Sequence, residues 1–421
     1  MQLDGPLRTS ILRTKLGAAA CMLLASGVPA AVRADTDTTT RVDVNALLYG
    51  EQSRANVAEP TARVTRLLAN GQSLSAQFGI DVITGASPSG AMPSGRVQTT
   101  TSASGTVKTT PAGEIPTVSF KDVRAALDVE WKKPLGSLLT STTGAHFSRE
   151  KDYQSAGANV KFSVDLDHRL TTLTAAAGFN RDGVFPQGGA PVGLTDGSAL
   201  IGTGSQSKHV TSGLVGISHV LTRRWMVAVN AAHTAESGYL TEPYKVVSLL
   251  DRRTGFTVGQ LTEKRPSTRN RSDILTNSVY HLTDDVLYLT YRYYWDDWGV
   301  RSNTFDVKYR HELEDNRYLQ PHVRFYSQTP AEFFQFGLIK GLPAPNFATS
   351  DYRLGPLRTL TIGTTYGFQL ADYPGEFSLR AEYIRQWGDG HPADAVGVQR
   401  TFDLFPSLSI GSLTAGYSIQ F

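Results

Sequence analysis

Hydrophobic and polar residues alternate along most of this chain. The last nine residues show the pattern clearly, because every second residue from Leu413 to Phe421 is apolar or aromatic and the residues between them are small or polar. The same alternation recurs in the segments 74–82, 123–132, 159–167, 287–295, 304–310 and 360–370. Alternation with a period of two residues over such lengths predicts β-strands and not helices.

The connections between these strands fall into two length classes. Turn-forming residues make short connections near 70–71, 133–136, 168–170, 221–224, 282–285, 314–316 and 372–375. Longer segments lie between them at 85–117, 181–206, 237–267, 329–358 and 387–407, with intermediate ones near 52–60 and 150–155 and a brief one near 297–301. We therefore expect about sixteen strands, near 41–50, 61–69, 72–84, 118–132, 137–149, 156–168, 171–180, 207–221, 224–236, 268–281, 286–296, 302–312, 317–328, 359–371, 376–387 and 408–421.

Strands with one apolar and one polar face, joined alternately by short and long connections, are typical of a transmembrane β-barrel. The sequence predicts an all-β fold, an antiparallel transmembrane barrel with short periplasmic turns, long extracellular loops and both termini in the periplasm. About fourteen to eighteen strands fit the same pattern, because strand boundaries are the weakest product of such reasoning. A soluble β-sandwich or propeller is the structural alternative, but the chain has no repeat of fixed period of the kind that propellers show.

The first 34 residues have the pattern of a secretory signal peptide. Basic residues including Lys15 precede an apolar stretch over 16–28, and Ala34 ends a short run suited to signal peptidase. We expect cleavage after Ala34, which divides the chain into a signal peptide over 1–34 and a barrel over 35–421. Cys21 offers a lipoprotein cleavage site as the alternative, although the apolar span between Lys15 and Cys21 is too short for a proper signal core.

The composition of the chain without the signal peptide agrees with the expected barrel. Removing residues 1–34 takes four basic and one acidic residue from totals of 41 and 38, so the mature chain is neutral and shows no basic excess for a nucleic-acid partner. The only cysteine leaves with it, which excludes disulfides and thiol nucleophiles from the mature chain. No later segment approaches the roughly 18 consecutive apolar residues of a transmembrane helix.

Ionisable side chains gather on the faces that oppose the apolar ones in the strands near 268–328. They are Arg271, Asp273, Arg292, Asp306, Lys308, Arg310, His322 and Arg324. In a barrel of this size the polar face lines a lumen that is water-filled or plugged by loops. These side chains form either a selectivity lining that favours anions or a wall of Arg–Asp pairs that stiffens the barrel.

Other candidate sites are weaker. The aromatic and acidic run of Trp295, Asp296, Asp297 and Trp298 has the composition of a membrane-interface rim. The nine histidines show no metal-ligand spacing, and the Gly- and Ser-rich segment after Asp81 lacks the spacing of a nucleophile elbow. We therefore expect no catalytic residue, metal or cofactor. An outer-membrane hydrolase that builds a Ser–His–acid site across strands stays an alternative, because spacing alone does not test it.

The end of the chain resembles a targeting signal. Tyr417, Ile419 and Phe421 resemble the C-terminal signature of bacterial outer-membrane proteins, which the barrel-assembly machinery reads. This resemblance implies that the chain has the assembly machinery and outer-membrane lipid as partners.

Several motifs together resemble one family over essentially the whole mature chain. They are Asp81 to Gly90 (DVITGASPSG), Lys151 to Tyr153 (KDY), Arg265 to Arg269 (RPSTR), Tyr291 to Gly299 (YRYYWDDWG), Val323 to Gln328 (VRFYSQ), Ala331 to Phe334 (AEFF) and Ser350 to Leu354 (SDYRL). The chain is identified as a member of a domain-of-unknown-function family (number 3570) of predicted outer-membrane barrels. The resemblance implies a cell outer membrane location in a Gram-negative bacterium and a periplasmic redox or flavin-related partner. It implies no catalytic residue.

Three functions are consistent with this sequence. The first is a passive channel, or the membrane component of an export or redox assembly, with a charged polar lumen. The second is a non-conducting structural barrel that serves as a scaffold for a periplasmic partner, which a lumen filled by the segments 85–117 or 329–358 would favour. The third is the outer-membrane hydrolase.

Overall fold

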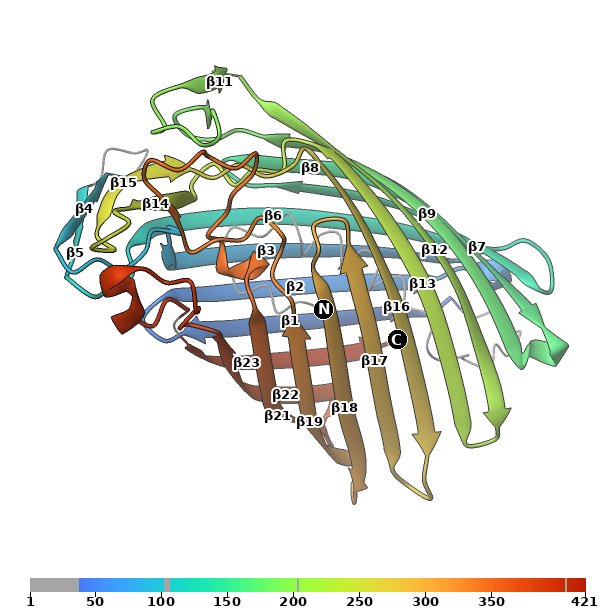
Figure 1. Ribbon diagram of the computed structural model, residues 1–421. Coiled ribbons are helices and arrows are strands. Elements are labelled where there is room, and N and C mark those ends of the chain that lie inside the picture. Colours follow the sequence, from blue (N-terminus) through green and yellow to red (C-terminus); the bar gives the residue numbers. More distant parts are fainter. Residues whose placement is uncertain (1–37, 102–106, 203, 406) are drawn as a thin grey trace.

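The chain forms a closed antiparallel β-barrel in the computed structural model (Figure 1). The structure describes residues 38–101, 107–202, 204–405 and 407–421, so the expected signal peptide and its cleavage site lie outside the described residues. None of the helices among the described residues is long and apolar enough to cross a membrane.

Sixteen strands make up the barrel, which confirms the fold class and the strand number expected from the sequence. In order around the barrel they are β1 (Thr40–Glu51), β2 (Ala55–Leu67), β3 (Ser73–Pro88), β6 (Thr117–Pro134), β7 (Leu139–Arg149), β8 (Tyr153–Leu166), β9 (Thr171–Val184), β12 (Gln206–Thr222), β13 (Trp225–Gly238), β16 (Thr268–His281), β17 (Val286–Asp296), β18 (Arg301–Leu313), β19 (Arg317–Gln328), β21 (Leu357–Leu370), β22 (Tyr373–Gly388) and β23 (Leu408–Gln420).

The first and last strands close the barrel. β1 pairs with β23 from Arg41 opposite Gln420 to Glu51 opposite Ile410, so neither strand leaves an open edge along this seam. The backbone N–H of Thr40 donates to the carbonyl oxygen of Phe421 at 2.6 Å, and the N–H of Phe421 donates back at 2.9 Å. The aromatic terminus therefore lies at the end of the closing seam.

Side chains alternate between the two faces of the wall as the sequence pattern indicates. Leu48, Phe78 and Phe305 are 56%, 48% and 52% exposed on the outer face, whereas Asp81 and Thr361 on the inner face are nearly buried. The sorting follows from the two-residue period of the strand, which sends successive side chains to opposite faces. The outer face is therefore the apolar one, as a barrel that faces lipid requires.

The turns at one end of the barrel are tight. Between β18 and β19, Asp315 and Asn316 both have positive φ values of 59° and 55°, the backbone that narrow hairpin turns favour and that Asp and Asn tolerate. The 3-10 helices η1 (Ala69–Gly71) and η2 (Asp167–Arg169) make two more of these turns. We call this the turn end and the opposite end, where the long connections lie, the loop end.

One strand begins earlier than expected. The sequence pattern predicts a connection near 52–60 and a strand over 61–69, whereas β2 runs from Ala55 to Leu67. Pro60 suggests a break, but the strand continues: the pairing of β2 with β3 is interrupted for two residues, between Ala58–Val82 and Thr61–Gly79, and resumes in the same register. A proline is tolerated at such an irregularity because no ladder hydrogen bond needs its missing N–H.

The five long connections fold together over the loop end (Figure 1), and we call them the loop cap. The cap comprises the described residues of 89–116, 185–205, 239–267, 329–356 and 389–407. Two of these segments share a sheet, in which β14 (Val246–Leu250) pairs with β15 (Thr257–Thr262) and, in parallel, with β20 (Gly337–Ile339). The smaller pairs β4 (Gln98–Thr101) with β5 (Val107–Thr110) and β10 (Ala190–Pro191) with β11 (Leu200–Gly202) complete its strands.

Hydrogen bonds and a small apolar core join the loops of the cap to one another. The Gln399 side-chain amide donates to the carbonyl oxygens of Pro93 at 3.0 Å and Gly255 at 2.8 Å, which ties three loops at one residue. The same three loops contribute to a buried apolar cluster of Met92, Leu250, Ala395 and Leu404. The cap is therefore a packed unit and not a set of independent loops.

Candidate functional site

A cluster of buried charges lies in the loop cap. The carboxylate of Asp351 accepts from Arg265 at 2.8 Å and also pairs with Arg353, and Arg265 lies 2.6 Å from Glu263. The side chains of Glu263 and Asp351 are 0% and 2% exposed. Buried charges are costly unless they are paired, so this network requires that the two loops stay together.

The electrostatics of this cluster depend on burial and on the sum of the charges. Burial alone would favour the neutral acid, but the neighbouring charges of Arg353, Lys245 and Arg265 hold the pKa of Asp351 well below its usual range. For Glu263 burial is the larger effect and raises the pKa, with Arg265 opposing it. The pKa values of the two acids are therefore displaced in opposite directions.

Lys245 connects the cluster to the barrel wall. Its Nζ donates to Oγ of Ser87 at 3.2 Å and to the carbonyl oxygen of Pro88, both at the end of β3. The lysine is buried, and burial lowers its pKa. A segment that ends a barrel strand is thereby held to a loop more than a hundred residues further along the chain.

A second group of paired charges faces the cap from the inner wall. Arg269 on β16 contacts Asp296 at 2.5 Å and lies over the ring of Trp298 at 4.3 Å from its centroid. Trp298 can turn back under the cap because Gly299 takes a φ of 84°, where a side chain would be strained.

The neighbouring strands continue this group. Arg271 on β16 lies 2.6 Å from Glu236 on β13, and Glu236 also lies 3.7 Å from Lys208 on β12. All three side chains are less than 10% exposed. The inner wall therefore presents paired charges to the cap over several strands.

A cavity of about 80 Å³ separates the two groups of charges, and we call it the charged chamber. Its lining includes Tyr153, Lys208, Glu236, Tyr239, Tyr244, Arg265, Arg269, Trp298, Asp351 and Arg353. The hydroxyl group of Tyr239 is buried there without a hydrogen-bond partner in the described part of the chain. A polar space of this volume holds several water molecules, and we expect water to satisfy this hydroxyl.

A family model matches residues 13–419 of the chain, and its description is "Protein of unknown function (DUF3570)". The chain belongs to this family. No curated protein matches this DUF3570 chain. Several of the motifs that resemble the family meet at the charged chamber. They contribute Arg265 and Arg269 from one motif, Asp296 and Trp298 from another, and Asp351 and Arg353 from a third, and all six line the chamber or pair with its lining.

Solved structures with a similar arrangement are bacterial outer-membrane barrels. The ferric enterobactin receptor PfeA of Pseudomonas aeruginosa shares 10% identity with a TM-score of 0.44, and the match covers 91% of this chain. This chain spans 61% of the length of that receptor. The outer membrane protein OpdK of the same organism shares 7% identity with a TM-score of 0.42, and the match covers 91% of this chain and 99% of OpdK.

The lumen residues singled out from the sequence all lie on the inner face of β16 to β19, and most of them are paired. Arg271 pairs with Glu236, Arg292 with Asp273 at 3.1 Å, and Arg310 with Glu312. His322 bridges Asp306 at 2.9 Å and Glu382 at 2.8 Å, and Arg324 lies 3.5 Å from Asp306. Among the described residues Lys308 has no ion-pair partner within 4.0 Å. The pattern is closer to a cross-braced wall than to a row of free charges.

The sequence pattern does not single out three residues that form ion pairs with this set or with one of its partners. They are Glu236, Lys208 and Glu382. Glu236 and Lys208 lie on β13 and β12, outside the range 268–328 that the sequence pattern singles out. Glu382 lies on β22 and meets His322 across β21. Alternation places each of them on the polar face, but only the pairing register shows which charges meet.

Two of the four expected rim residues lie elsewhere. Trp295 is on the outer face and stacks on Tyr293 with 5.6 Å between ring centroids, and Asp297 accepts from the side chain of Asn270 at 2.8 Å. The side chain of Asp296 and the ring of Trp298 are buried at the charged chamber instead. The aromatic and acidic composition of this segment predicts a rim. The burial of Asp296 and Trp298 depends on the cap that covers this strand end, and local composition does not report that contact.

A Ser–His–Asp arrangement occurs on the inner face of β6 and β7. Oγ of Ser148 lies 3.3 Å from Nε2 of His146, and Nδ1 of His146 lies 2.6 Å from Asp128. Ser148 is only 1% exposed, and it lies near the loop end of β7, where regular pairing with β6 and β8 uses the neighbouring backbone N–H groups. The serine therefore faces the lumen and not lipid, without the free N–H donors that stabilise an oxyanion.

Three carboxylates form the group that is best able to hold a metal among the described residues. Asp122, Glu150 and Asp152 bring oxygens within 4.8 Å of one another. An all-oxygen set suits a hard cation such as Ca²⁺. Asp152 already accepts from the hydroxyl of Tyr244 at 2.9 Å, and grouped acidic residues are common without a metal, so we assign none.

Proposed function

We propose that the chain is an outer-membrane β-barrel whose loop end is held closed, and that it serves as the membrane component of a periplasmic assembly and not as an open pore. The observation that carries this proposal is the charged chamber with the packed cap above it. Buried, paired charges at the junction of cap and wall resist separation, because opening the cap would expose or unpair them.

The outer-membrane location is part of the proposal. The apolar outer face, the sixteen strands and the closed seam between β1 and β23 support it. The long loops then lie outside the cell and the short turns in the periplasm. We also propose that export removes residues 1–34.

Access to the lumen from the turn end supports a periplasmic partner. Inner-face side chains near the cap, such as Ser155 and Ser148, are 1% exposed. Towards the turn end the side chains of Glu130 and Glu312 are 27% and 37% exposed. A periplasmic protein can therefore reach the polar lumen, and the family resemblance implies that this partner is redox- or flavin-related.

Single-channel recording of the refolded protein in a planar bilayer, with an asymmetric salt gradient at neutral pH, tests the proposal. We expect no discrete conductance steps from protein that migrates as a folded, heat-modifiable barrel in gel electrophoresis. Replacing residues 330–355, which form most of one of the five connections of the cap, with a short Gly-rich linker should open the loop end and produce steps, which controls for insertion. Regular steps from the unmodified barrel would refute the closed state.

A passive anion-favouring channel is the second candidate, and the inner-wall cations favour it. Lys308 and Arg380 both face the lumen, and neither has an ion-pair partner within 4.0 Å among the described residues. Unpaired cations in a lumen attract anions. The same recording distinguishes the candidates, because this channel would show steps with anion preference from the unmodified protein.

A further inference from the structure

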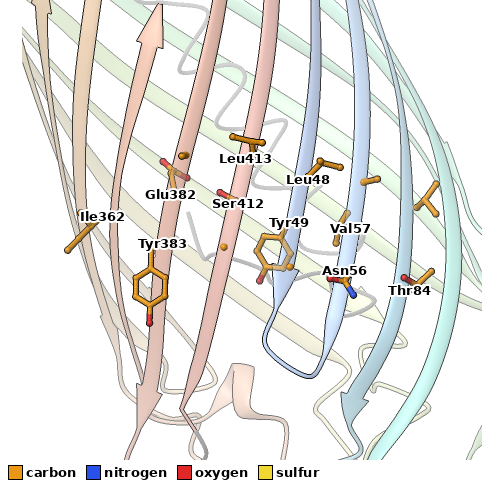
Figure 2. A pocket seen from close by; sticks show the side chains of 15 residues that line it. Leu48, Tyr49, Asn56, Val57, Thr84, Ile362, Glu382, Tyr383, Ser412 and Leu413 are labelled. Atoms are coloured by element: carbon orange, nitrogen blue, oxygen red, sulfur yellow. The ribbon is translucent and has the colours of Figure 1, made fainter.

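The outer face of the barrel carries a groove that the lumen chemistry does not involve (Figure 2). It crosses β1, β2 and β3 on one side of the closing seam and β21, β22 and β23 on the other. Its volume is about 890 Å³, within the range of ligand-binding pockets. Figure 2 shows that it lies close to the turn joining β1 and β2, which belongs to the loop end.

The groove is hollow because small residues form its floor. Gly50 and Gly411 are opposite each other across the closing seam, and Ala58 and Ala381 lie one outward position nearer the turn end on the next strands. Larger apolar side chains flank them, among them Leu48, Ile362 and Leu413. A surface of this kind, placed among lipid chains, fits the hydrocarbon chains of a lipid.

Basic side chains stand at the loop-end rim of this groove. Arg385 follows Tyr383 of the groove by two residues on β22, which places it about 7 Å further toward the loop end. Arg358 on β21 lies one outward position beyond Leu360, the residue opposite Arg385. Lys121 on β6 is opposite Thr84 at the other side of the groove.

The rim is ordered and carries one sign of charge. The guanidinium of Arg385 donates to Oγ of Ser409 at 2.8 Å and to Oγ of Ser407 at 2.6 Å, which holds it over β23. On β1, β2, β3, β21, β22 and β23, all of them fully described, every acidic side chain lies on the inner face. An exposed arginine is well suited to bind phosphate, because its planar guanidinium group can donate hydrogen bonds to two phosphate oxygens.

We propose that this groove binds lipid A, the phosphorylated glycolipid anchor of lipopolysaccharide. The floor would take an acyl chain, and Arg358, Arg385 and Lys121 would take the phosphates. Two observations favour this occupant over a phospholipid of the inner leaflet. The groove lies at the loop end, which faces the outer leaflet, and its cations stand on both sides of it, as a headgroup with two phosphates requires. The inference rests on the proposed membrane orientation but not on the closed lumen.

Binding is measured by native mass spectrometry of the purified, refolded full-length protein in detergent, with diphosphoryl lipid A and with phosphatidylglycerol as separate probes. We expect one tightly held lipid A and at least a tenfold weaker response to phosphatidylglycerol. The double variant Arg358→Gln/Arg385→Gln should lose affinity for lipid A about tenfold. Equal binding of the two lipids would overturn the assignment to lipid A.

A second variant fills the floor without touching the charges. A side chain at Gly411 would meet open space within 4 Å, so Gly411→Leu should fold normally and displace the acyl chain. The matched control is Arg181→Gln, which removes an exposed outward arginine near the loop end of β9, half-way around the barrel. Lipid A binding unchanged in Gly411→Leu and in the double arginine variant would refute the proposal. Loss in both, with Arg181→Gln unchanged, would support it.

Discussion

The guanidinium of Arg265 and the carboxylate of Asp351 lie 2.8 Å apart although 86 residues separate them in the sequence. Arg265 lies near the end of the connection between β13 and β16, and Asp351 precedes the 3-10 helix η3 (Tyr352–Leu354) in the connection between β19 and β21. Both side chains are buried. The contact therefore joins two loops that leave different parts of the barrel wall.

Removing this carboxylate should loosen the cap. Asp351→Ala leaves Arg265 and Arg353 without their shared partner, and breaking a buried ion pair costs about 3–5 kcal/mol. We expect faster proteolysis of the segment 329–356 in detergent and conductance steps in planar bilayers. The control is Asp315→Asn in a short turn, which keeps a residue that tolerates the positive φ there and removes a pair with Arg317 that is largely exposed and worth about 0–1 kcal/mol. Equal protease resistance in both variants would contradict the role of the cluster.

The same cluster makes the cap sensitive to acid. Because the pKa of Asp351 is held below its ordinary value of 3.8, its contribution is present above that pH and fades as the pH falls further below it. The charged groups that face it are Arg265, Arg353, Lys245, Glu242 and Glu263. Burial raises the pKa of Glu263, so that residue contributes to the pH dependence with the opposite sign.

The variant Asp351→Asn isolates this effect. Proteolysis of the cap should accelerate as the pH falls from about 4 to about 2 in the unmodified protein. The Asp351→Asn variant should be cut faster than the unmodified protein at pH 5 and show a smaller change on acidification. An identical pH profile for the two proteins would show that Asp351 does not control the cap.

Lys308 should determine part of the ion preference once the lumen is open. In a barrel whose cap residues 330–355 are replaced by a linker, Lys308→Glu replaces an unpaired lumen cation with an anion. The reversal potential in a salt gradient should move toward cation preference. The control is Lys121→Glu, a change of an exposed lysine on the outer face of β6, which should leave the reversal potential unchanged. Equal shifts in both variants would mean that Lys308 has no special place in the conduction path.

The C-terminal residue should matter for assembly more than for the finished fold. Phe421 is 69% exposed at the end of the closing seam, so its ring contributes little packing. We expect Phe421→Ala to lower the amount of heat-modifiable protein in outer-membrane fractions severalfold, with refolding in detergent unaffected. Ser418→Ala, a change on the inner face of the same strand, is the control. Normal membrane levels of the Phe421→Ala variant would contradict a targeting role.

The mature N-terminus gives a direct test of export. Intact-mass measurement of protein extracted from outer membranes should show a chain that begins at Asp35. A chain that begins at Cys21 and carries lipid would identify a lipoprotein instead.

The barrel strands could be predicted from the sequence because the alternation of apolar and polar side chains depends only on residues close together in the chain. A two-residue period reports which face of a strand meets apolar surroundings, and this signal placed β16, β17 and β19 at their observed bounds. It failed at β2, because the strand continues through Pro60 in one register although proline usually ends a strand. The cap could not be predicted, because contacts such as that of Gln399 with Pro93 join residues far apart in sequence and leave no periodic trace.

The candidate site was predictable only in part for the same reason. Alternation placed Arg271 and Arg292 on the polar face, but it did not show that a carboxylate neutralises each of them. The local sequence, rich in aromatic and acidic residues, predicts that Asp296 and Trp298 belong to a membrane-interface rim. Their burial depends on the segment 329–356, whose position follows from tertiary packing alone.

Because the first strand pairs with the last, the barrel can close only after the whole chain has been synthesised. Until Leu408–Gln420 have left the ribosome, β1 has no neighbour on one side, and an unpaired strand edge is a template for association with other chains. A product that stops early cannot close at all. A chain that lacks β23 therefore keeps two open strand edges and is prone to associate with other chains.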